Sequence, residues 1–302
     1  MKKLGALLVT ASLVFALQGY AEDTHQKAGT STGQTSTATH SVHWGYTGAG
    51  SPEKWGDLDT KYATCKTGKY QSPIDIITAA PTVVESIAFS YRATPLKIVN
   101  NGHTIQVNTN AESAIQVHGK EYKLVQFHFH SPSEHTMNGK QYAMEVHLVH
   151  KNDEGQLAVV GVLMQPGKPH ALLQTLVEHL PTDINQEKVV QNVRVNPKDF
   201  FPRETQYYHY NGSLTTPPCS EGVAWFVMKT PIEVSAEQVS QFTAVMHQNA
   251  RPVQPLHDRV VLEKPYLQQP TTSYLAAAAT LVRCFAKNAS VFGQESLSAS
   301  AR

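Results

Sequence analysis

The sequence contains little charge and little cysteine. Asp, Glu, Lys and Arg make up 16% of its 302 residues, and 25 basic side chains nearly balance 24 acidic ones. Because a nucleic-acid backbone is held by an excess of basic groups, a net charge of +1 argues against nucleic-acid binding. Three cysteines are too few for a small fold built on a disulfide framework. The 41% of apolar residues is enough for a hydrophobic core and excludes a chain that is disordered throughout.

Long apolar runs are also absent after the N-terminus. Residues 1–21 contain a basic start, Met1-Lys2-Lys3, an uncharged and mostly apolar run over residues 4–17, and small residues at Gly19 and Ala21. This pattern is typical of a cleaved signal peptide. The alternative, an uncleaved anchor, would need about 20 apolar residues to span a bilayer. We therefore expect an exported protein, periplasmic or secreted, without a membrane anchor.

The rest of the chain divides into a leader, a domain and a tail. Residues 22–40 are rich in Thr, Ser, Gly and Gln, a composition that predicts a flexible leader. Residues 41–265 are predicted to form one domain, and residues 266–302 a C-terminal tail. Within the tail, residues 273–287 favour a short helix. That helix would dock on the domain or on another chain, and the second alternative would make a homodimer.

Short β-type runs fill the predicted domain. They are separated by turn signals such as Asn101-Gly102 and Asn138-Gly139, and the best helical candidates are residues 171–180 and 236–246. This pattern predicts a single β-dominated (α+β) domain with few short helices, instead of the two domains that the length suggests. The clearest strand candidates cover residues 96–99, 104–107, 123–129, 143–150 and 157–164.

Histidine is present in unusual number, with 15 copies, and two predicted strands concentrate it. His128 and His130 are two residues apart, so they share one face of a strand while the phenylalanines beside them point the other way. Because Asn138-Gly139 separates this strand from the next, the next strand can return antiparallel and bring His147 beside the pair. His150 has the wrong parity to join them, so we interpret it as a packing or surface histidine.

The same parity places polar side chains beside the clustered histidines. Gln126 shares a face with His128, and Glu145 shares a face with His147. An amide or carboxylate in such a position can fix the tautomer of a metal-binding imidazole. Three imidazoles without a fourth protein ligand are typical of a catalytic zinc site with an open position. A lone His-x-His pair is common without metal, so the hypothesis depends on the third histidine.

Two further segments could complete such a site. Glu134 follows the histidine strand directly, and Thr215 lies in a stiff, hydroxyl-bearing loop over residues 213–219. A threonine hydroxyl that donates to a carboxylate can only accept a hydrogen bond from a metal-bound hydroxide, which would aim that nucleophile at a substrate. Taken separately, Glu134 could equally be a surface carboxylate and the loop merely a rigid turn.

Taken together, the motifs of this sequence resemble those of an α-class carbonic anhydrase of the exported bacterial type. The resemblance covers about 210 residues in the family's order. It rests on His43-Trp44-Gly45-Tyr46, Gln71-Ser72-Pro73-Ile74-Asp75-Ile76, Asn101-Gly102-His103, Phe127-His128-Phe129-His130, Ser133-Glu134-His135-Thr136, Glu145-Val146-His147-Leu148-Val149-His150, Leu214-Thr215-Thr216-Pro217-Pro218-Cys219 and Asn249-Ala250-Arg251-Pro252.

The resemblance implies a central, mostly antiparallel twisted sheet of about ten strands, with one Zn²⁺ per chain at the floor of a conical cleft. The implied reaction is reversible hydration of carbon dioxide to bicarbonate and a proton by zinc-bound hydroxide, followed by histidine-mediated proton transfer. The implied zinc ligands are His128, His130 and His147. Thr215 matches the residue that orients the hydroxide, and Glu134 matches the carboxylate that accepts a hydrogen bond from the threonine hydroxyl.

The resemblance also assigns positions around the metal. His103 matches the proton shuttle, with Tyr46, Asn101 and Gln106 around the connecting waters. Asn249 is expected beside the zinc ligands, together with Gln126 and Glu145. The implied substrate pocket contains Val149, Val159, Leu214, Thr216, Val223 and Trp225. The implied disulfide joins Cys65 to Cys219, which leaves Cys284 in the tail as a buried, free or interchain cysteine.

Two functions compete with the enzyme. A non-catalytic binding module on the same fold typically lacks one or more of the ligand histidines, whereas this chain has all three. A periplasmic zinc carrier would need a disordered histidine-rich tract or an exchangeable metal, whereas these histidines occupy predicted strand positions. We therefore expect a zinc-dependent carbonate dehydratase whose small-molecule partner is carbon dioxide or bicarbonate.

Overall fold

The computed structural model describes residues 43–77, 79–81, 87–110 and 112–264. The predicted signal peptide, leader and tail, including Cys284, lie outside these residues, so their boundaries stay predictions. Within the described ranges, every helix is too short or too polar to cross a membrane.

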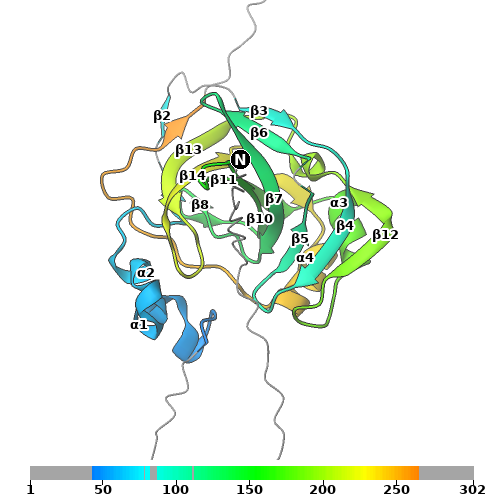
Figure 1. Cartoon of the computed structure of the whole chain (residues 1–302), viewed down its shortest axis with the longest axis horizontal. Coiled ribbons are helices and arrows are strands. Elements are labelled where there is room, and N and C mark those ends of the chain that lie inside the picture. Colours follow the sequence, from blue (N-terminus) through cyan, green and yellow to red (C-terminus); the bar gives the residue numbers. More distant parts are fainter. Residues whose placement is uncertain (1–42, 78, 82–86, 111, 265–302) are drawn as a thin grey trace, which may run out of the picture. The chain divides into compact units, whose positions relative to one another are not determined.

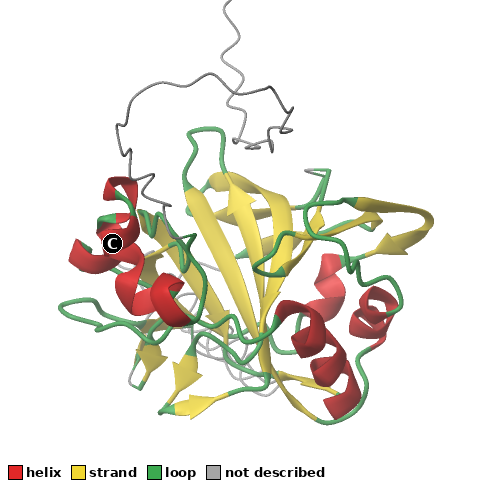
Figure 2. Ribbon diagram, turned by 90° about the horizontal axis from the view of Figure 1, so that it is seen from below, coloured by secondary structure: helices red, strands yellow, loops and turns green. Residues whose placement is uncertain are grey.

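Most of the described strands belong to one thirteen-stranded sheet, which is strongly twisted (Figures 1 and 2). Its main path runs through β12 (Lys188–Val195), β4 (Thr94–Asn100), β5 (Ile105–Asn108), β7 (Lys120–His130), β10 (Met144–Lys151), β11 (Leu157–Pro166), β14 (Glu221–Met228), β13 (Tyr207–Ser213), β16 (Leu262–Glu263) and β2 (Ala80–Pro81). Beside this path, β15 (Ile232–Val234) pairs with β11, and β6 (Ala114–Val117) pairs with β7 and β3 (Ala88–Ser90). Antiparallel pairs predominate, which confirms the predicted β-dominated class.

A small separate sheet reverses the chain between the two histidine strands. It contains β1 (Asp75–Ile76), β8 (Thr136–Met137) and β9 (Lys140–Gln141). Asn138 and Gly139 connect β8 to β9, and both have positive φ values, 52° and 74°. A two-residue hairpin turn requires this conformation, which Asn-Gly adopts readily. As a result β10 runs antiparallel to β7, as the sequence predicts.

The two faces of the main sheet pack against different side chains. On β11, Val160 and Val162 belong to the larger hydrophobic cluster, whereas Val159 belongs to a smaller one that contains Trp225. Since neighbouring residues of a strand point to opposite faces, the two clusters lie on opposite sides of the sheet. Register pairing through β10 places the predicted metal ligands on the side of the smaller cluster.

Helices are few and lie at the margins of the sheet (Figure 2). α4 (Ala236–Met246) has the predicted bounds, and a capping box between Ser235 and Gln238 satisfies its first N–H groups. α3 (Ala171–Val177) ends earlier than the predicted Leu180. Pro181 follows, and a proline disfavours helical backbone in the residue before it, so the last residues form i to i+3 turns instead. The remaining helical segments are η1 (Gly48–Gly50), η2 (Pro52–Lys54), α1 (Trp55–Leu58), η3 (Thr60–Tyr62), α2 (Thr64–Thr67) and η4 (Pro197–Phe200).

A disulfide and a buried arginine join the N-terminal helices to the loop after β13. Cys65 and Cys219 are bonded to each other across a sequence separation of 154 residues. The guanidinium of Arg251 donates to the Cys65 carbonyl at 3.0 Å and to the Gln71 amide oxygen at 2.9 Å. The Gln71 amide in turn donates to the Cys219 carbonyl at 3.0 Å. These bonds fix the loop that contains Thr215 from two sides.

We predict that replacing both bonded cysteines by serine lowers the free energy of unfolding by about 4 kcal/mol, because the crosslink restricts a long loop in the unfolded chain. Urea unfolding under non-reducing conditions measures this change. Reductant should destabilise the parent protein toward the variant and leave the variant itself unchanged. A loss below about 1 kcal/mol would show that loop entropy contributes little here.

A buried histidine generates a second prediction, on pH. His150 accepts from the Tyr91 hydroxyl through Nε2 at 2.8 Å and donates from Nδ1 to the Ala158 carbonyl at 3.2 Å, so its neutral form is fully paired. Burial lowers the pKa of His150 from 6.5 to about 4. The contacts of neutral His150 therefore contribute fully to stability above its pKa in the unfolded chain, 6.5. This contribution is lost as the pH falls toward and through its pKa in the folded chain, about 4.

We expect the free energy of unfolding to decrease more steeply with acid in the parent protein than in a His150→Gln variant. The difference in slope should approach about 1.4 kcal/mol per pH unit within the window from 6.5 to 4. Chemical unfolding at several pH values on both proteins measures it, and equal slopes would contradict the assignment.

Candidate metal centre

Three histidines from two adjacent strands converge on one face of the sheet. His128 and His130 come from β7, and His147 comes from β10, where its Cα lies opposite that of His128. One ring nitrogen of each histidine lies within 4.8 Å of the others. His130 and His147 are buried, and His128 is partly exposed toward a cavity. The parity argument therefore places these three side chains correctly.

Each histidine of this triad has one ring nitrogen engaged by the protein. Nδ1 of His128 bonds to the Gln126 amide oxygen at 2.8 Å, and Nε2 of His147 bonds to Oε1 of Glu145 at 2.9 Å. Nδ1 of His130 bonds to the backbone carbonyl of Asn249 at 2.8 Å. Because all three acceptors require an N–H, the opposite nitrogens keep free lone pairs: Nε2 of His128, Nε2 of His130 and Nδ1 of His147.

Burial keeps these imidazoles neutral. Burial lowers the pKa of His130 to about 4, holds the pKa of His128 well below its usual range and also lowers the pKa of His147. Nearby imidazoles add to the lowering for His128 and His147. A neutral imidazole is the form that binds a metal ion, so the site is prepared for a cation.

Glu145 is buried and uses both carboxylate oxygens. Oε1 accepts from His147 and from Nδ1 of His135 at 2.8 Å, and Oε2 accepts the backbone N–H groups of Glu134 and His135. Burial by itself would raise the pKa of Glu145. The combined effect of His135 and His147 is larger and opposite, so the pKa of Glu145 lies well below its usual range and the carboxylate stays ionised. Gly161 on β11 makes room for it, since a Cβ there would lie 2.8 Å from Oε1.

Glu134 lies on the other side of the triad. Its Oε1 accepts the backbone N–H of Arg251 at 2.9 Å, and its Oε2 lies 3.5 Å from Nε2 of His130. Burial raises the pKa of Glu134 to about 7, against the opposing effects of His147, the Arg251 N–H and the Thr215 hydroxyl. Thr215 is buried as well. No described residue donates a hydrogen bond to Oε2 itself.

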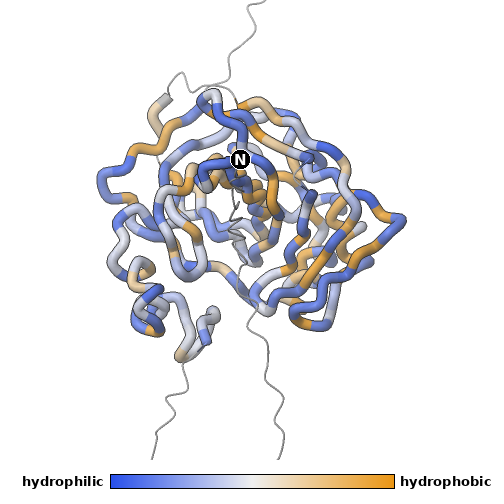
Figure 3. The backbone as a smooth tube through the Cα atoms, in the orientation of Figure 1, coloured by the Kyte–Doolittle hydropathy of each residue, from blue (hydrophilic) through white to orange (hydrophobic). Residues whose placement is uncertain are grey.

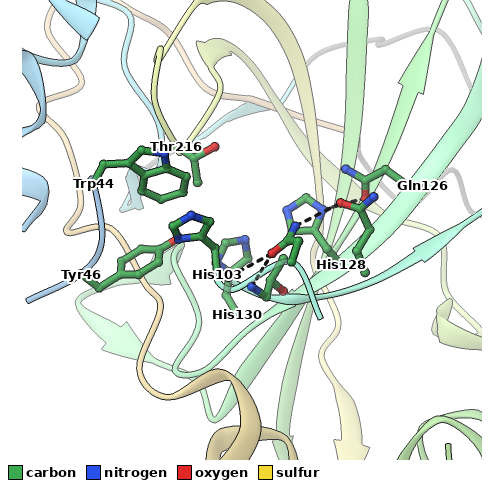
Figure 4. A pocket seen from close by; sticks show the side chains of 10 residues that line it. Trp44, Tyr46, His103, Gln126, His128, His130 and Thr216 are labelled. Atoms are coloured by element: carbon green, nitrogen blue, oxygen red, sulfur yellow. Dashed lines mark hydrogen bonds between the residues drawn. The ribbon is translucent and has the colours of Figure 1, made fainter. Parts of the chain in front are cut away.

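A cavity of about 140 Å³ opens beside His128 and His130 (Figure 4). The cavity brings His103, the predicted proton shuttle, close to the strand that carries the metal ligands. Figure 4 shows His103 between Trp44 and Tyr46 on one side and His128 and His130 on the other. Among the residues predicted for the site, its lining includes Tyr46, Asn101, His103, Gln106, Gln126, His128, His130 and Thr216, and Trp44 and Thr104 complete it.

His103 is held in this cavity by stacking and by its turn. Its ring stacks on Trp44, with centroids 3.6 Å apart, and the exposed ring of His43 lies parallel at 5.2 Å. Oδ1 of Asn101 accepts the N–H groups of His103 and Thr104, so Asn101 shapes the turn as well as lining the cavity. Burial, and then the charge of His43, lower the pKa of His103 to about 4.

The predicted substrate pocket separates into two parts. Thr216 lines the cavity, whereas five apolar residues belong to the smaller hydrophobic cluster and do not line it. Trp225 connects the two parts, because its ring lies 4.8 Å from that of His147. The five apolar residues are Val149, Val159, Leu214, Val223 and Trp225.

Two buried residues near the triad received no role from the sequence. His135 bonds to Glu145 through Nδ1 and to the Tyr210 hydroxyl through Nε2 at 2.7 Å. Arg251 supplies the N–H that holds Glu134. Both lie in loops, where the period-two parity of strands gives no information about direction. Their place in the quoted motifs was the only signal available.

The residues present fit a metal ion. Nε2 of His130 is buried without a hydrogen-bond partner among the described residues, an arrangement that costs free energy unless a ligand is bound. It faces the free nitrogens of the two other histidines. Three neutral nitrogens, with no fourth side-chain ligand in the part of the chain that the structure describes, match zinc in a site that leaves one position open. A second group, His135, Glu145 and His147, is satisfied by its own hydrogen bonds and does not require a metal.

The chain is similar in sequence to bacterial proteins named carbonic anhydrase. The chain is 43% identical over 227 residues to a carbonic anhydrase from Nostoc sp., covering 74% of this chain and 86% of that one. It is 42% identical over 229 residues to a carbonic anhydrase from Pectobacterium carotovorum, covering 76% and 93%.

Solved structures agree with the sequence comparison on the fold. The α-carbonic anhydrase from Thermovibrio ammonificans, solved with sulfanilamide, superposes with a TM-score of 0.71 at 45% identity, covering 73% of this chain and 98% of that chain. Dioscorin, solved with ascorbate, superposes with a TM-score of 0.69 at 31% identity, covering 76% and 100%.

The family profile described as eukaryotic-type carbonic anhydrase matches residues 50–265, which contain all three clustered histidines. We conclude that this chain belongs to the eukaryotic-type, or α, carbonic anhydrase family.

Proposed function

We propose that the chain is a zinc enzyme that reversibly converts carbon dioxide and water to bicarbonate and a proton. The convergence of His128, His130 and His147, each oriented by a hydrogen bond from its other ring nitrogen, supports this proposal most directly. When bound, zinc supplies a nucleophile at neutral pH by lowering the pKa of water to about 7, a value for which carbonic anhydrases are themselves the reference case. The proposed reaction is the one that membership of the carbonic anhydrase family implies.

Thr215 and Glu134 would orient the attacking oxygen. In this proposal the Thr215 hydroxyl donates to Glu134, so that only its lone pairs face the nucleophile and accept a hydrogen bond from it. Glu134 must be ionised for this role. The backbone N–H of Arg251 favours the ionised form, and a bound dication would favour it further.

The apolar cluster beside the triad would receive carbon dioxide. Trp225 and Val223 are almost fully buried, and Val149 and Leu214 pack against them with part of their surface exposed. Carbon dioxide is small and carries no charge, so an apolar wall can hold it without satisfying polar groups. Bicarbonate is charged and is disfavoured at such a wall, which assists product release.

His103 would move the proton outward. Its ring lines the same cavity as His128, and the exposed His43 lies beyond it. Burial holds the stacked ring neutral and therefore able to accept a proton. Because the pKa of His103 is lowered to about 4, uptake from a donor near 7 is uphill. Proton removal is therefore the step that a soluble buffer should accelerate. Tyr46, Asn101 and Gln106 would order the waters between donor and acceptor.

We also propose that the enzyme works outside the inner membrane. The N-terminal segment has the pattern of a signal peptide, and a disulfide is stable in an oxidising compartment. Whether the tail makes a homodimer is open to direct measurement by sedimentation.

The zinc proposal predicts the effect of removing one ligand. His128→Ala should weaken zinc binding by more than about 100-fold, since even residues that only orient a ligand commonly cost that much, and carbon dioxide hydration should be lost with the metal. Metal analysis and stopped-flow hydration on purified protein measure both. His150→Gln, on β10 and outside the triad, is the matched control and should retain zinc and activity. A His128→Ala variant that keeps stoichiometric zinc would overturn the ligand assignment.

The proton-transfer proposal predicts a selective loss. His103→Ala should retain zinc and lower kcat about 10-fold to 100-fold in weak buffer, with kcat restored by added imidazole. Because the proton leaves after bicarbonate, kcat/KM should change little. If imidazole leaves the variant unchanged, His103 is not the shuttle.

A further inference from the structure

Asn249 contacts both the shuttle turn and the ligand strand. It follows α4 and is itself fully buried, although His247 and Gln248 just before it are exposed. Its Nδ2 donates to the carbonyl of His103 and to the carbonyl of Phe129, both at 2.9 Å. Its Oδ1 accepts the N–H of Ser131 at 2.8 Å. One side chain therefore joins three backbone groups from two separate segments.

The chemistry of these partners requires an amide. Two carbonyls need two donors and one N–H needs an acceptor, and only the carboxamide group supplies this set in so short a side chain. The orientation of the amide follows from the same partners. Aspartate has the same shape, but its oxygens would face two carbonyls and repel them. The Asn249 site thus distinguishes the two side chains by hydrogen bonding alone.

Asn249 acts on the metal site by a different group. Its backbone carbonyl, not its side chain, accepts the bond from Nδ1 of His130. A change of side chain therefore leaves that acceptor in place. A second contact joins the same segments, since the Thr104 hydroxyl donates to the Phe129 carbonyl at 2.6 Å and accepts its N–H at 3.1 Å. This contact holds the strand end when the amide is changed.

We propose that the Asn249 side chain is a positioning residue for proton transfer, which sets the distance and angle of His103 relative to the metal ligands. The proposal rests on the proposed function of His103 as the shuttle. Without the amide, the carbonyl of His103 loses its hydrogen bond to Asn249, and the Thr104 hydroxyl remains as the link between this turn and β7, so the ring of His103 is held less firmly against Trp44. Transfer through ordered waters depends on that placement, because small displacements of a reacting group cost large factors in rate.

The test compares Asn249→Asp with Asn152→Asp in the full chain loaded with zinc. Asn152 is a matched control: it is buried in the turn between β10 and β11, and its Oδ1 accepts the Gln156 N–H at 2.7 Å. Asn249→Asp should keep zinc and keep kcat/KM within about twofold, while kcat in weak buffer falls about tenfold and recovers in imidazole. Asn152→Asp should match the parent protein in all four measurements.

A readout independent of turnover uses the ring stack. In the parent protein the ring protons of His103 lie over Trp44 and should resonate upfield, and a His103→Ala spectrum assigns them. Asn249→Asp should abolish that upfield shift, and Asn152→Asp should retain it. Should Asn249→Asp fold poorly, Asn249→Ser keeps a single donor and should give an intermediate shift and an intermediate kcat.

Three results would overturn the proposal. They are loss of zinc in Asn249→Asp, an equal fall in kcat and kcat/KM, and an unchanged His103 resonance. Failure of the proposed function has another signature, namely a parent protein without hydration activity or a His103→Ala variant that imidazole does not rescue. In that case the resonance would still report whether Asn249 positions the ring.

Discussion

The whole site depends on the register between β7 and β10. His147 lies opposite His128 only because the two strands pair in one register, and neighbouring residues alternate between faces. A slip of one residue would send His147 into the larger hydrophobic cluster and would bring Leu148 or Val146 to the metal position. Asn138 and Gly139 reverse the chain between the strands, and the phenylalanines of β7 fill the opposite face. Packing on one face thus secures the chemistry on the other.

Burying so many polar groups in one place requires that each find a partner. Glu145 has four donors for its two oxygens, which compensates the cost of removing its charge from water. Arg251 is buried, and burial lowers its pKa to about 10, yet its guanidinium reaches carbonyl and amide oxygens of three residues. Among the described residues around the triad, the buried atoms without a partner are Nε2 of His130, at the metal position, and Oε2 of Glu134, 3.5 Å from that nitrogen. The network is complete except where a ligand belongs.

Much of the strand arrangement could be predicted from local pattern. The alternation around His128 and His130 indicated a strand with one polar face, and the Asn-Gly pair indicated the hairpin that returns β10. The end of α3 was predicted three residues too late. Helical propensity does not take into account that Pro181 disfavours helical backbone in Leu180 before it. The pairing of Cys65 with Cys219 came from the resemblance, since no local pattern relates residues 154 apart. Roles for His135 and Arg251 could not be predicted, because loop side chains have no periodicity.

The sequence by itself determined the family, the β-dominated class and the three histidines that share a face, because these follow from motif order and from the two-residue period of a strand. Only the tertiary structure decided how each ring is held. It showed that the backbone carbonyl of Asn249, and not its side chain, orients His130. The side-chain amide donates instead to the carbonyl of His103. The physical reason is distance along the chain: hydrogen bonds between residues more than 100 positions apart depend on how loops meet after folding, which no local pattern encodes.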